Sequence, residues 1–193
     1  MLYSISRSFC ALICRLLLTV KINGKENVPV QGGFILASNH KSNLDPILLA
    51  VVCKRKIGFM AKESLFKVPV LSWILSNAAT FPVKRNGADT FALKNAIKKV
   101  SSGKGLGIFP EGTRSESKQP SKILPGIGFI AARTNAPVIP VFIRGTEIAL
   151  PKGAKFIRPA KVSITFGKPV TYNKTLSYQE IAESVMNNIR KLQ

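Results

Sequence analysis

Residues 34–53 read FILASNHKSNLDPILLAVVC, and this stretch indicates the fold class. Phe34–Ser38 is a short apolar run that leads into a polar segment, which is typical of a buried strand. Residues 46–53 are apolar on every side, so we expect them to form a short buried helix. A buried strand, a polar turn and a buried helix in succession are characteristic of α/β domains built around a parallel sheet.

The same alternation continues along the chain. Short apolar runs predict five further strands, at residues 57–60, 80–83, 106–109, 138–143 and 162–166. Helical patterns occupy residues 70–75, 89–100, 126–133 and 177–192, and the last opens with a capping box, Ser177-x-x-Glu180. We therefore predict a single α/β domain with a mostly parallel central sheet flanked by helices, in which ligands bind at the carboxyl ends of strands. The polar residues 115–121 are expected to form a surface loop.

Composition restricts the partners of the chain. Its 193 residues include 29 Lys and Arg but nine Asp and Glu, which gives a formal net charge of +20. So large an excess indicates an anionic partner, such as nucleic acid, an anionic membrane surface or a phosphorylated substrate. A basic nucleic-acid-binding module is a rival interpretation, but no such motif is present and we expect no nucleic-acid partner. One histidine and three scattered cysteines argue against a zinc site or a disulfide framework, so we expect no metal and no cofactor.

Residues 2–20 predict an amphipathic helix, because apolar side chains recur at spacings of three and four. These side chains are Leu2, Ile5, Phe9, Leu12, Leu16 and Val20. The helix could pack on the core of the domain, or it could lie in a membrane interface with its arginines at the lipid phosphates. The basic charge favours the interface, so we divide the chain into an interfacial helix at 1–22 and a domain at 23–193. No apolar stretch reaches the ~20 residues of a membrane-spanning helix, and we expect no signal peptide.

His40 and Asp45 lie between the strand and the helix of the opening stretch. Two helix starts are open: Ser42 caps the helix, or Asp45 caps it with Pro46 at the first helical position. In either case His40 lies in the preceding turn, where its ring can meet the carboxylate. A carboxylate bonded to one ring nitrogen leaves the other as a base, and the reference histidine pKa of ~6.5 suits proton abstraction near neutrality. A purely structural histidine is the alternative.

Two other segments place cations directly after strands. One holds Lys84 and Arg85, and the other reads Glu111-Gly112-Thr113-Arg114. The planar guanidinium of arginine matches pairs of phosphate oxygens, and turn N–H groups add to such a site, so both segments are candidate phosphate ligands. Glu111 is expected to hold an arginine or to bond a substrate hydroxyl. Solvated surface charge is the alternative for each cation.

Four motif blocks follow one another in the order of a known family. They are Asn39-His40-x-Ser42-x-x-Asp45, Phe81-Pro82-x-x-Arg85, Phe109-Pro110-Glu111-Gly112-Thr113-Arg114-Ser115 and Val138-Ile139-Pro140-Val141. This arrangement resembles the 1-acyl-sn-glycerol-3-phosphate acyltransferases. The resemblance implies transfer of a fatty acyl group from an acyl carrier protein or coenzyme A thioester to lysophosphatidic acid, giving phosphatidic acid in phospholipid synthesis.

The resemblance also implies roles for single residues. His40 would be the general base, oriented by Asp45, in direct attack without an acyl-enzyme. Arg85 and Arg114, with Gly112 and Thr113, would hold the acceptor phosphate, and Glu111 would help to bind the acceptor. Backbone amides near the turn after His40 are plausible donors to the oxyanion. A related enzyme that acts on glycerol 3-phosphate or another lysophospholipid, or a thioesterase that uses the same pair on water, remains an alternative.

The location follows from charge and resemblance together. We expect a peripheral or monotopic protein at the cytoplasmic face of the cell membrane. The expected membrane face combines the N-terminal helix with residues 144–168, which hold six cations and one acid. An acidic carrier protein could dock on the same segment.

Overall fold

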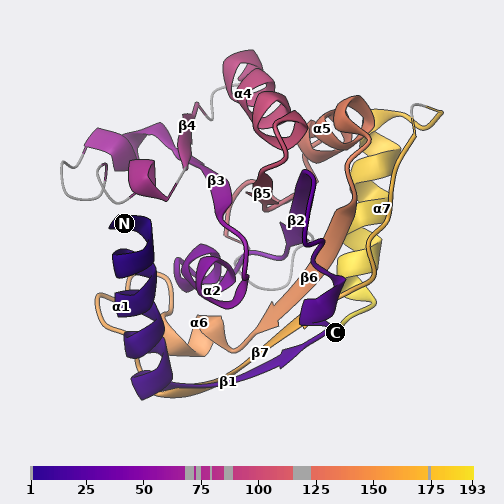
Figure 1. The fold of residues 1–193 in the computed structure, drawn as a ribbon. Helices are drawn as coiled ribbons and strands as arrows, with labels where there is room; N and C mark the ends of the chain where they lie inside the picture. The colour runs from indigo at the N-terminus through magenta and orange to yellow at the C-terminus, as the bar shows by residue number, and fades with distance from the viewer. Residues whose placement is uncertain are drawn as a thin grey trace.

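A computed structural model describes residues 2–67, 72, 75–78, 80–84, 89–114, 123–173 and 175–193. Within these ranges seven strands form one sheet in the order β1-β7-β6-β2-β5-β3-β4 (Figure 1). They are β1 (Leu18–Asn23), β2 (Phe34–Ser38), β3 (Ile57–Lys62), β4 (Phe81–Val83), β5 (Gly105–Ile108), β6 (Val138–Arg144) and β7 (Ala160–Phe166). Of the neighbouring pairs in this sheet, β6 and β7 alone run antiparallel, so the predicted mostly parallel sheet is confirmed.

Helices cover both faces of the sheet (Figure 1). One face carries α1 (Leu2–Leu17), α2 (Leu44–Val52) and α6 (Thr146–Ala149), and the other carries α4 (Thr90–Ser101), α5 (Gly126–Thr134) and α7 (Tyr178–Arg190). Alternate residues of β2 enter the two cores: Phe34 and Leu36 pack on one side, and Ile35 and Ala37 on the other. Because both faces are buried, the central strands have continuous apolar sequences rather than alternating ones.

The predicted strands and most predicted helices lie within two residues of their observed positions. The capping box of α7 is present, since Ser177 Oγ accepts from the Glu180 N–H and the Ser177 N–H donates to the Glu180 carboxylate. Two 3-10 turns, at Lys25–Asn27 and Glu63–Lys67, were not predicted, nor was α6. The predicted helix at 70–75 falls largely outside the described residues, and the predicted loop at 115–121 falls wholly outside them.

The N-terminal helix ends earlier than predicted. The pattern at 2–20 predicts a helix through residue 20, but α1 ends at Leu17 and residues 18–23 form β1, which pairs with β7 in parallel. β-Branched residues at 19, 20 and 22 favour a strand, and the backbone groups of β7 provide the partners. Among the described residues, no helix has both the length and the apolar character that crossing a membrane requires.

The helix α1 packs on the domain through the face that carries Arg7 and Cys14. Arg7 donates two hydrogen bonds to the Val51 carbonyl near the end of α2, and Cys14 is buried in the core. The large apolar side chains point outward instead: Ile5, Phe9, Leu12 and Leu16 are all more than half exposed. Arg7 therefore anchors the helix to α2. This corrects the expectation that the Arg7 side chain reaches lipid phosphates.

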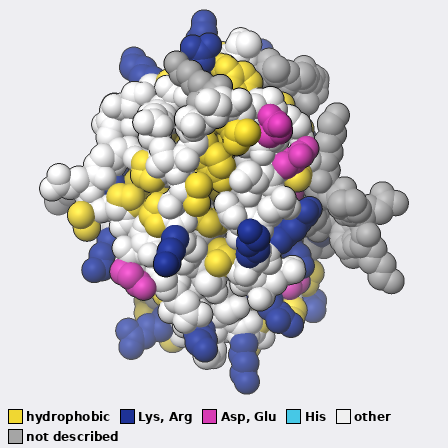
Figure 2. Space-filling model, turned by 90° about the vertical axis from the view of Figure 1, so that its right-hand side faces the viewer, with side chains coloured by type: hydrophobic (Ala, Val, Ile, Leu, Met, Phe, Trp, Pro, Cys, Tyr) yellow, Lys and Arg dark blue, Asp and Glu magenta, His cyan; other side chains and the backbone are white. Residues whose placement is uncertain are grey.

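Basic side chains are frequent on the face of the molecule that carries α7. Figure 2 shows the face on the side of α7, where Lys and Arg project around an apolar middle and Asp and Glu are few. The net charge of +20 attracts an anionic partner to the protein at long range.

Candidate active site

The turn between β2 and α2, residues 39–45, is held at its start by a side chain that continues the sheet. Asn39 Nδ2 donates to the Ile143 carbonyl at 2.8 Å, and the Ile143 N–H donates to Asn39 Oδ1 at 2.8 Å. The side-chain amide of Asn39 thereby continues the pairing with β6 beyond the point where the backbone of β2 turns away from β6. This pairing fixes where the next residue, His40, leaves the carboxyl end of the sheet.

His40 and Asp45 meet across this turn, as the sequence predicts. His40 Nδ1 lies 2.9 Å from Asp45 Oδ2, and the same oxygen accepts the N–H groups of Lys41 and Ser42 at 2.8 Å each. The Asp45 side chain is 1% exposed and that of His40 is 14% exposed. Because a carboxylate only accepts, Nδ1 carries the hydrogen in neutral His40 and Nε2 is the basic nitrogen.

The helix start differs from both capping alternatives. Asn43 occupies the N-cap position, and Asp45 lies in the first turn of α2, from which its carboxylate reaches back to the preceding N–H groups. Those amides are consequently already bonded. The expectation that the amides just after His40 stabilise the oxyanion is therefore wrong for Lys41 and Ser42.

Glu111 supports His40 from the neighbouring strand. β2 and β5 pair in parallel, and the loop after β5 brings Glu111 Oε2 to 3.0 Å from the His40 N–H. Burial raises the pKa of the Glu111 carboxyl, while the His40 N–H bond and the nearby His40 and Lys41 charges oppose that rise. The contact that the structure records for Glu111 is thus with the His40 backbone. The expected bond to an arginine or to a substrate hydroxyl stays a prediction, since Arg85 lies outside the described residues.

An aromatic ring sets the plane of the imidazole. Phe109 stacks on His40 with ring centroids 4.1 Å apart and an angle of 20° between the planes, and Phe59 lies behind Phe109 at 6.0 Å. One face of the imidazole is therefore covered by apolar surface. Together with the Asp45 bond, this stacking restricts rotation of the ring.

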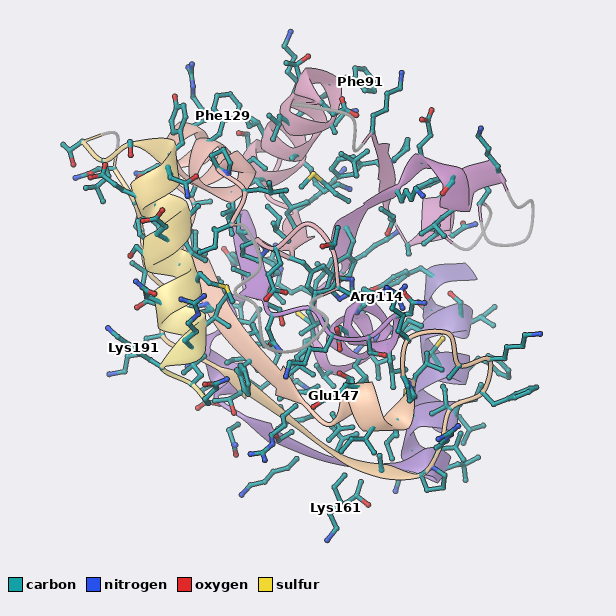
Figure 3. The ribbon with its side chains drawn as sticks, turned by 180° about the vertical axis from the view of Figure 1, so that it is seen from behind. Phe91, Arg114, Phe129, Glu147, Lys161 and Lys191 are labelled. Carbon is teal, nitrogen blue, oxygen red and sulfur yellow. The ribbon has the colours of Figure 1, made fainter. Side chains whose placement is uncertain are left out.

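Gly112 shapes the turn that carries the second set of candidate residues. Its N–H donates to the Phe109 carbonyl at 2.9 Å, and its φ of +67° lies in the left-handed region. A Cβ there would lie 2.5 Å from Leu124 Cδ1, so a side chain does not fit without a shift. The turn then presents an exposed Thr113 and a half-buried Arg114. Figure 3 shows Arg114 on the side of α1 and α2, whereas Phe91 and Phe129 lie on the side of α4 and α5.

The other cationic segment is described only in part. Lys84 is exposed, and its N–H donates to Asp89 Oδ2 at 2.8 Å. This bond and that from Ala92 lower the pKa of the Asp89 carboxyl, which caps α4. Arg85, the second cation of the segment, lies outside the described residues.

The three cysteines and the hydroxyl of Ser42 do not suit covalent catalysis. Burial raises the pKa values of Cys10, Cys14 and Cys53, which keeps them as thiols. Ser38 and Ser42 each lie two positions from His40, and Ser38 Oγ donates to the Asn39 carbonyl at 3.1 Å while Ser42 Oγ donates to the Leu150 carbonyl at 2.7 Å. Within the described ranges no three His, Cys, Asp or Glu side chains gather as metal ligands. The arrangement fits a base that acts on an external hydroxyl or water.

Comparison with known proteins identifies the family. A family model described as Acyltransferase matches residues 19–144, which include His40, Asp45, Glu111 and Arg114. The 1-acyl-sn-glycerol-3-phosphate acyltransferase of Bacillus subtilis is 32% identical over 167 residues, covering 84% of this chain and 81% of that protein. The chain belongs to the 1-acyl-sn-glycerol-3-phosphate acyltransferase family. The resemblance of the motif blocks is thereby confirmed, and the chain is an acyltransferase.

Two further similarities extend this result. A chloroplastic 1-acyl-sn-glycerol-3-phosphate acyltransferase of Brassica napus is 31% identical and covers 79% of this chain, which in turn spans 45% of that longer protein. The crystal structure of the 1-acyl-sn-glycerophosphate acyltransferase from Thermotoga maritima superposes with a TM-score of 0.77 at 28% identity. That match covers 99% of this acyltransferase and 80% of the other chain, so the shared fold includes the N-terminal region.

Two supporting residues were not identified as functional from the sequence. Asn39 and Phe109 occur in the motif blocks, but the sequence predicts no role for either. In the structure Asn39 fixes where His40 leaves the sheet, and Phe109 stacks on the ring of His40. The signal was available for Asn39, since an amide that directly follows a buried strand can extend its pairing. No comparable signal exists for Phe109, because stacking across two strands depends on the strand order.

Proposed function

We propose that this acyltransferase transfers a fatty acyl group from an acyl thioester to the free hydroxyl of lysophosphatidic acid, forming phosphatidic acid. The observation that carries the proposal is the His40–Asp45 contact at the carboxyl end of β2, inside the region that matches the family. The names of the relatives support lysophosphatidic acid as the acceptor. The thioester would be carried by acyl carrier protein or coenzyme A, and no other cofactor is required.

The chemistry follows from the tautomer of His40. Asp45 holds the hydrogen on Nδ1, so Nε2 can remove the proton of the acceptor hydroxyl as its oxygen attacks the thioester carbonyl carbon. The tetrahedral intermediate then collapses and breaks the carbon–sulfur bond. The imidazolium returns its proton to the departing thiolate, which leaves a free thiol and a new ester. Asp45 stabilises the positive ring in between.

The acceptor phosphate would be held by the cationic turns. Arg114, on the turn shaped by Gly112, is the candidate for a paired interaction with the phosphate oxygens, with Arg85 as its partner and Thr113 as a hydroxyl donor. Lys84 adds positive charge at the same strand ends. Glu111 is bonded to the His40 N–H, and we assign it to positioning the base beside the acceptor rather than to binding the phosphate.

Replacing Arg114 with alanine is expected to raise the KM for lysophosphatidic acid roughly 10- to 100-fold with a smaller change in kcat, because a charge-assisted phosphate contact is lost. Steady-state kinetics with varied acceptor measure this effect. Arg133→Ala is the matched control, since Arg133 is an exposed arginine over Phe129 on α5, on the opposite face of the sheet. An unchanged KM in the Arg114 variant would exclude it from the phosphate site.

The acceptor and donor classes are tested together in one panel. Purified protein is assayed with lysophosphatidic acid, glycerol 3-phosphate and a zwitterionic lysophospholipid, each with an acyl carrier protein and a coenzyme A thioester. We expect turnover with lysophosphatidic acid and slow reaction of the others, since they lack either the first acyl chain or the phosphomonoester. Preference for another acceptor would replace the assignment with that of a related acyltransferase, and thioester hydrolysis alone would indicate a thioesterase.

We propose further that the enzyme works as a peripheral or monotopic protein on an anionic membrane, at its cytoplasmic face. The outward apolar side of α1, together with α6 and the segment after it, supports this, because Ile148 on α6 and Phe156 beyond it are exposed among cations. Both views of the ribbon place this segment beside α1 (Figures 1 and 3). Apolar side chains ringed by Lys and Arg suit the boundary between acyl chains and anionic headgroups.

Removing one apolar contact of α1 is expected to weaken lipid binding. Phe9 is 63% exposed on α1 and Phe91 is 69% exposed on α4, on the opposite face of the sheet. Phe9→Gln is expected to lower the affinity for phosphatidylglycerol vesicles by roughly tenfold, while Phe91→Gln leaves it unchanged. Vesicle co-sedimentation measures both. Equal losses in the two variants would show that α1 does not form the lipid-binding surface.

A further inference from the structure

A compact loop separates α6 from β7. Residues 150–158, here called the interfacial loop, close on themselves because the Arg158 N–H donates to the Ala149 carbonyl at 2.8 Å and the Ala154 N–H donates to the Pro151 carbonyl at 3.0 Å. The loop contains three cations and no acid. Phe156 within it is 81% exposed, so a rigid base supports an exposed, basic and aromatic tip.

One buried hydroxyl connects this loop to the catalytic turn. Ser42 Oγ donates to the Leu150 carbonyl at 2.7 Å and accepts the Leu44 N–H at 3.2 Å, and the residue is fully buried. The backbone N–H of the same residue donates to Asp45 Oδ2 at 2.8 Å. Ser42 thus contacts both the first residue of the interfacial loop and the carboxylate that orients His40.

A local capping role does not account for the contact with Leu150. The N-cap position of α2 belongs to Asn43, and no side-chain capping bond is made there. The bond from Ser42 to Leu150 joins residues 108 positions apart in the chain. To serve the start of α2, the Ser42 hydroxyl needs only to accept the Leu44 N–H. Its additional bond to the Leu150 carbonyl therefore has another role.

We infer that Ser42 is a positioning residue that couples contact between the interfacial loop and an anionic lipid surface to the placement of Asp45, and through Asp45 to the placement of His40. This inference rests on the proposed function, because it concerns the same base. The inference extends the proposed function, because the rate of the chemical step would then depend on the lipid surface as well as on the substrates. Lipid contact would favour one arrangement of the loop, and the Leu150 carbonyl would transmit that preference.

The coupling path is short and contiguous. Lipid headgroups meet Lys155 and Arg158, which are exposed cations, and acyl chains meet Phe156. The base of the loop is held to α6, because the Leu150 N–H donates to the Thr146 carbonyl at 2.9 Å and the Arg158 N–H donates to the Ala149 carbonyl. We expect displacement of the tip to reach Leu150 through this hydrogen-bonded base. From Leu150, a single bond reaches Ser42 and a second reaches Asp45.

The test compares Ser42→Ala with the wild type in the presence and absence of vesicles made of equal parts phosphatidylcholine and phosphatidylglycerol. The substrates are short-chain and water-soluble, so that vesicles do not deliver them. We expect the vesicles to raise the kcat of the wild type by roughly two- to tenfold, the range set by one buried hydrogen bond, and not to raise that of Ser42→Ala. Vesicle binding by co-sedimentation is expected to be equal in both. Equal activation of both proteins, or none in the wild type, overturns the inference.

Ser102→Ala is the matched control. Its hydroxyl also donates to a backbone carbonyl, that of Lys99 at 2.8 Å, but it lies at the end of α4 on the other face of the sheet. We expect this variant to retain the full vesicle activation. Loss of activation in Ser102→Ala as well would show a general effect of removing hydroxyls and would overturn the specific role of Ser42.

A second readout does not depend on activity. His40 is the only histidine of the chain, so its ring gives a single set of histidine NMR signals. Bicelles that contain phosphatidylglycerol are expected to shift these signals in the wild type, less in Phe156→Gln, and not in Ser42→Ala. A full shift in Phe156→Gln or in folded Ser42→Ala overturns the coupling. Phe156→Gln replaces an exposed side chain, so it still decides the question where Ser42→Ala folds too poorly for kinetics. If the wild type transfers no acyl group at all, the proposed function fails while this NMR comparison still decides the coupling.

Discussion

Replacing His40 with alanine is expected to lower the kcat of acyl transfer by roughly 10²- to 10⁴-fold, the usual contribution of a positioned general base. The chain contains no second histidine that could take over the proton. Water remains as a weak substitute base, so the residual rate should be small but measurable. The KM values for donor and acceptor are expected to change little, because the contacts proposed for the acceptor phosphate lie on other residues.

The same substitution should leave the fold intact. The His40 side chain is partly exposed, so its removal forfeits about 0.5–1.5 kcal/mol of stacking on Phe109 and one hydrogen bond to Asp45. Asp45 Oδ2 keeps its two backbone donors. The bond from the His40 N–H to Glu111 involves the backbone and is retained in the variant. Urea unfolding and vesicle co-sedimentation serve as controls for folding and lipid binding. A folded variant with the kcat of the wild type would remove His40 from the mechanism.

The strand–turn–helix at 34–53 was predictable because its information is local. The strand and helix are apolar and buried, and the turn between them is polar. Because the turn is short, His40 and Asp45 had to be near each other once strand and helix were recognised. The same local pattern predicted that Glu111 follows a strand. The sequence does not predict that this strand, β5, lies beside β2. The contact of Glu111 with the His40 backbone follows from that strand order.

The periodicity of α1 left its orientation open, and only the basic charge of the chain favoured an outward apolar side. Its sequence shows which side is apolar, and in a water-soluble domain that side normally packs inward. Here Arg7 bonds the Val51 carbonyl and the apolar side faces outward. The spacing of apolar residues is the same whether the apolar side packs inward or faces outward. Only the surface on which the helix packs distinguishes the two orientations. β1 was missed because the helical pattern continues into a segment that β7 recruits as a strand.

Asp45 is the second position at which a large effect is expected, and two substitutions separate its hydrogen bonds from its charge. Asp45→Ala is expected to lower kcat by roughly 10²- to 10³-fold, because the ring of His40 loses the acceptor that orients it. Asp45→Asn is expected to lower kcat by only about tenfold, the difference between a charged and a neutral hydrogen-bond partner.

The milder effect of asparagine follows from the donors around one oxygen. Asp45 Oδ2 accepts the N–H groups of Lys41 and Ser42 as well as the ring of His40. An amide NH₂ in that position would face two backbone donors, so the asparagine must turn its oxygen toward them. The His40 Nδ1 hydrogen then keeps its acceptor, and Nε2 stays basic. What is lost is the negative charge that stabilises the imidazolium.

Alanine, in contrast, leaves two backbone N–H groups without their acceptor. Each buried donor left unsatisfied costs about 1–3 kcal/mol, so Asp45→Ala should lower the free energy of unfolding by about 2 kcal/mol or more, and Asp45→Asn by less. Urea unfolding of the three proteins measures this order, and ¹⁵N NMR of the single histidine reports which ring nitrogen carries the hydrogen. An asparagine variant as inactive as the alanine variant, with its hydrogen on Nε2, would show that the two backbone amides do not set the orientation of residue 45. The loss of kcat in Asp45→Asn could then no longer be attributed to the lost charge alone, because the tautomer of His40 would have changed as well.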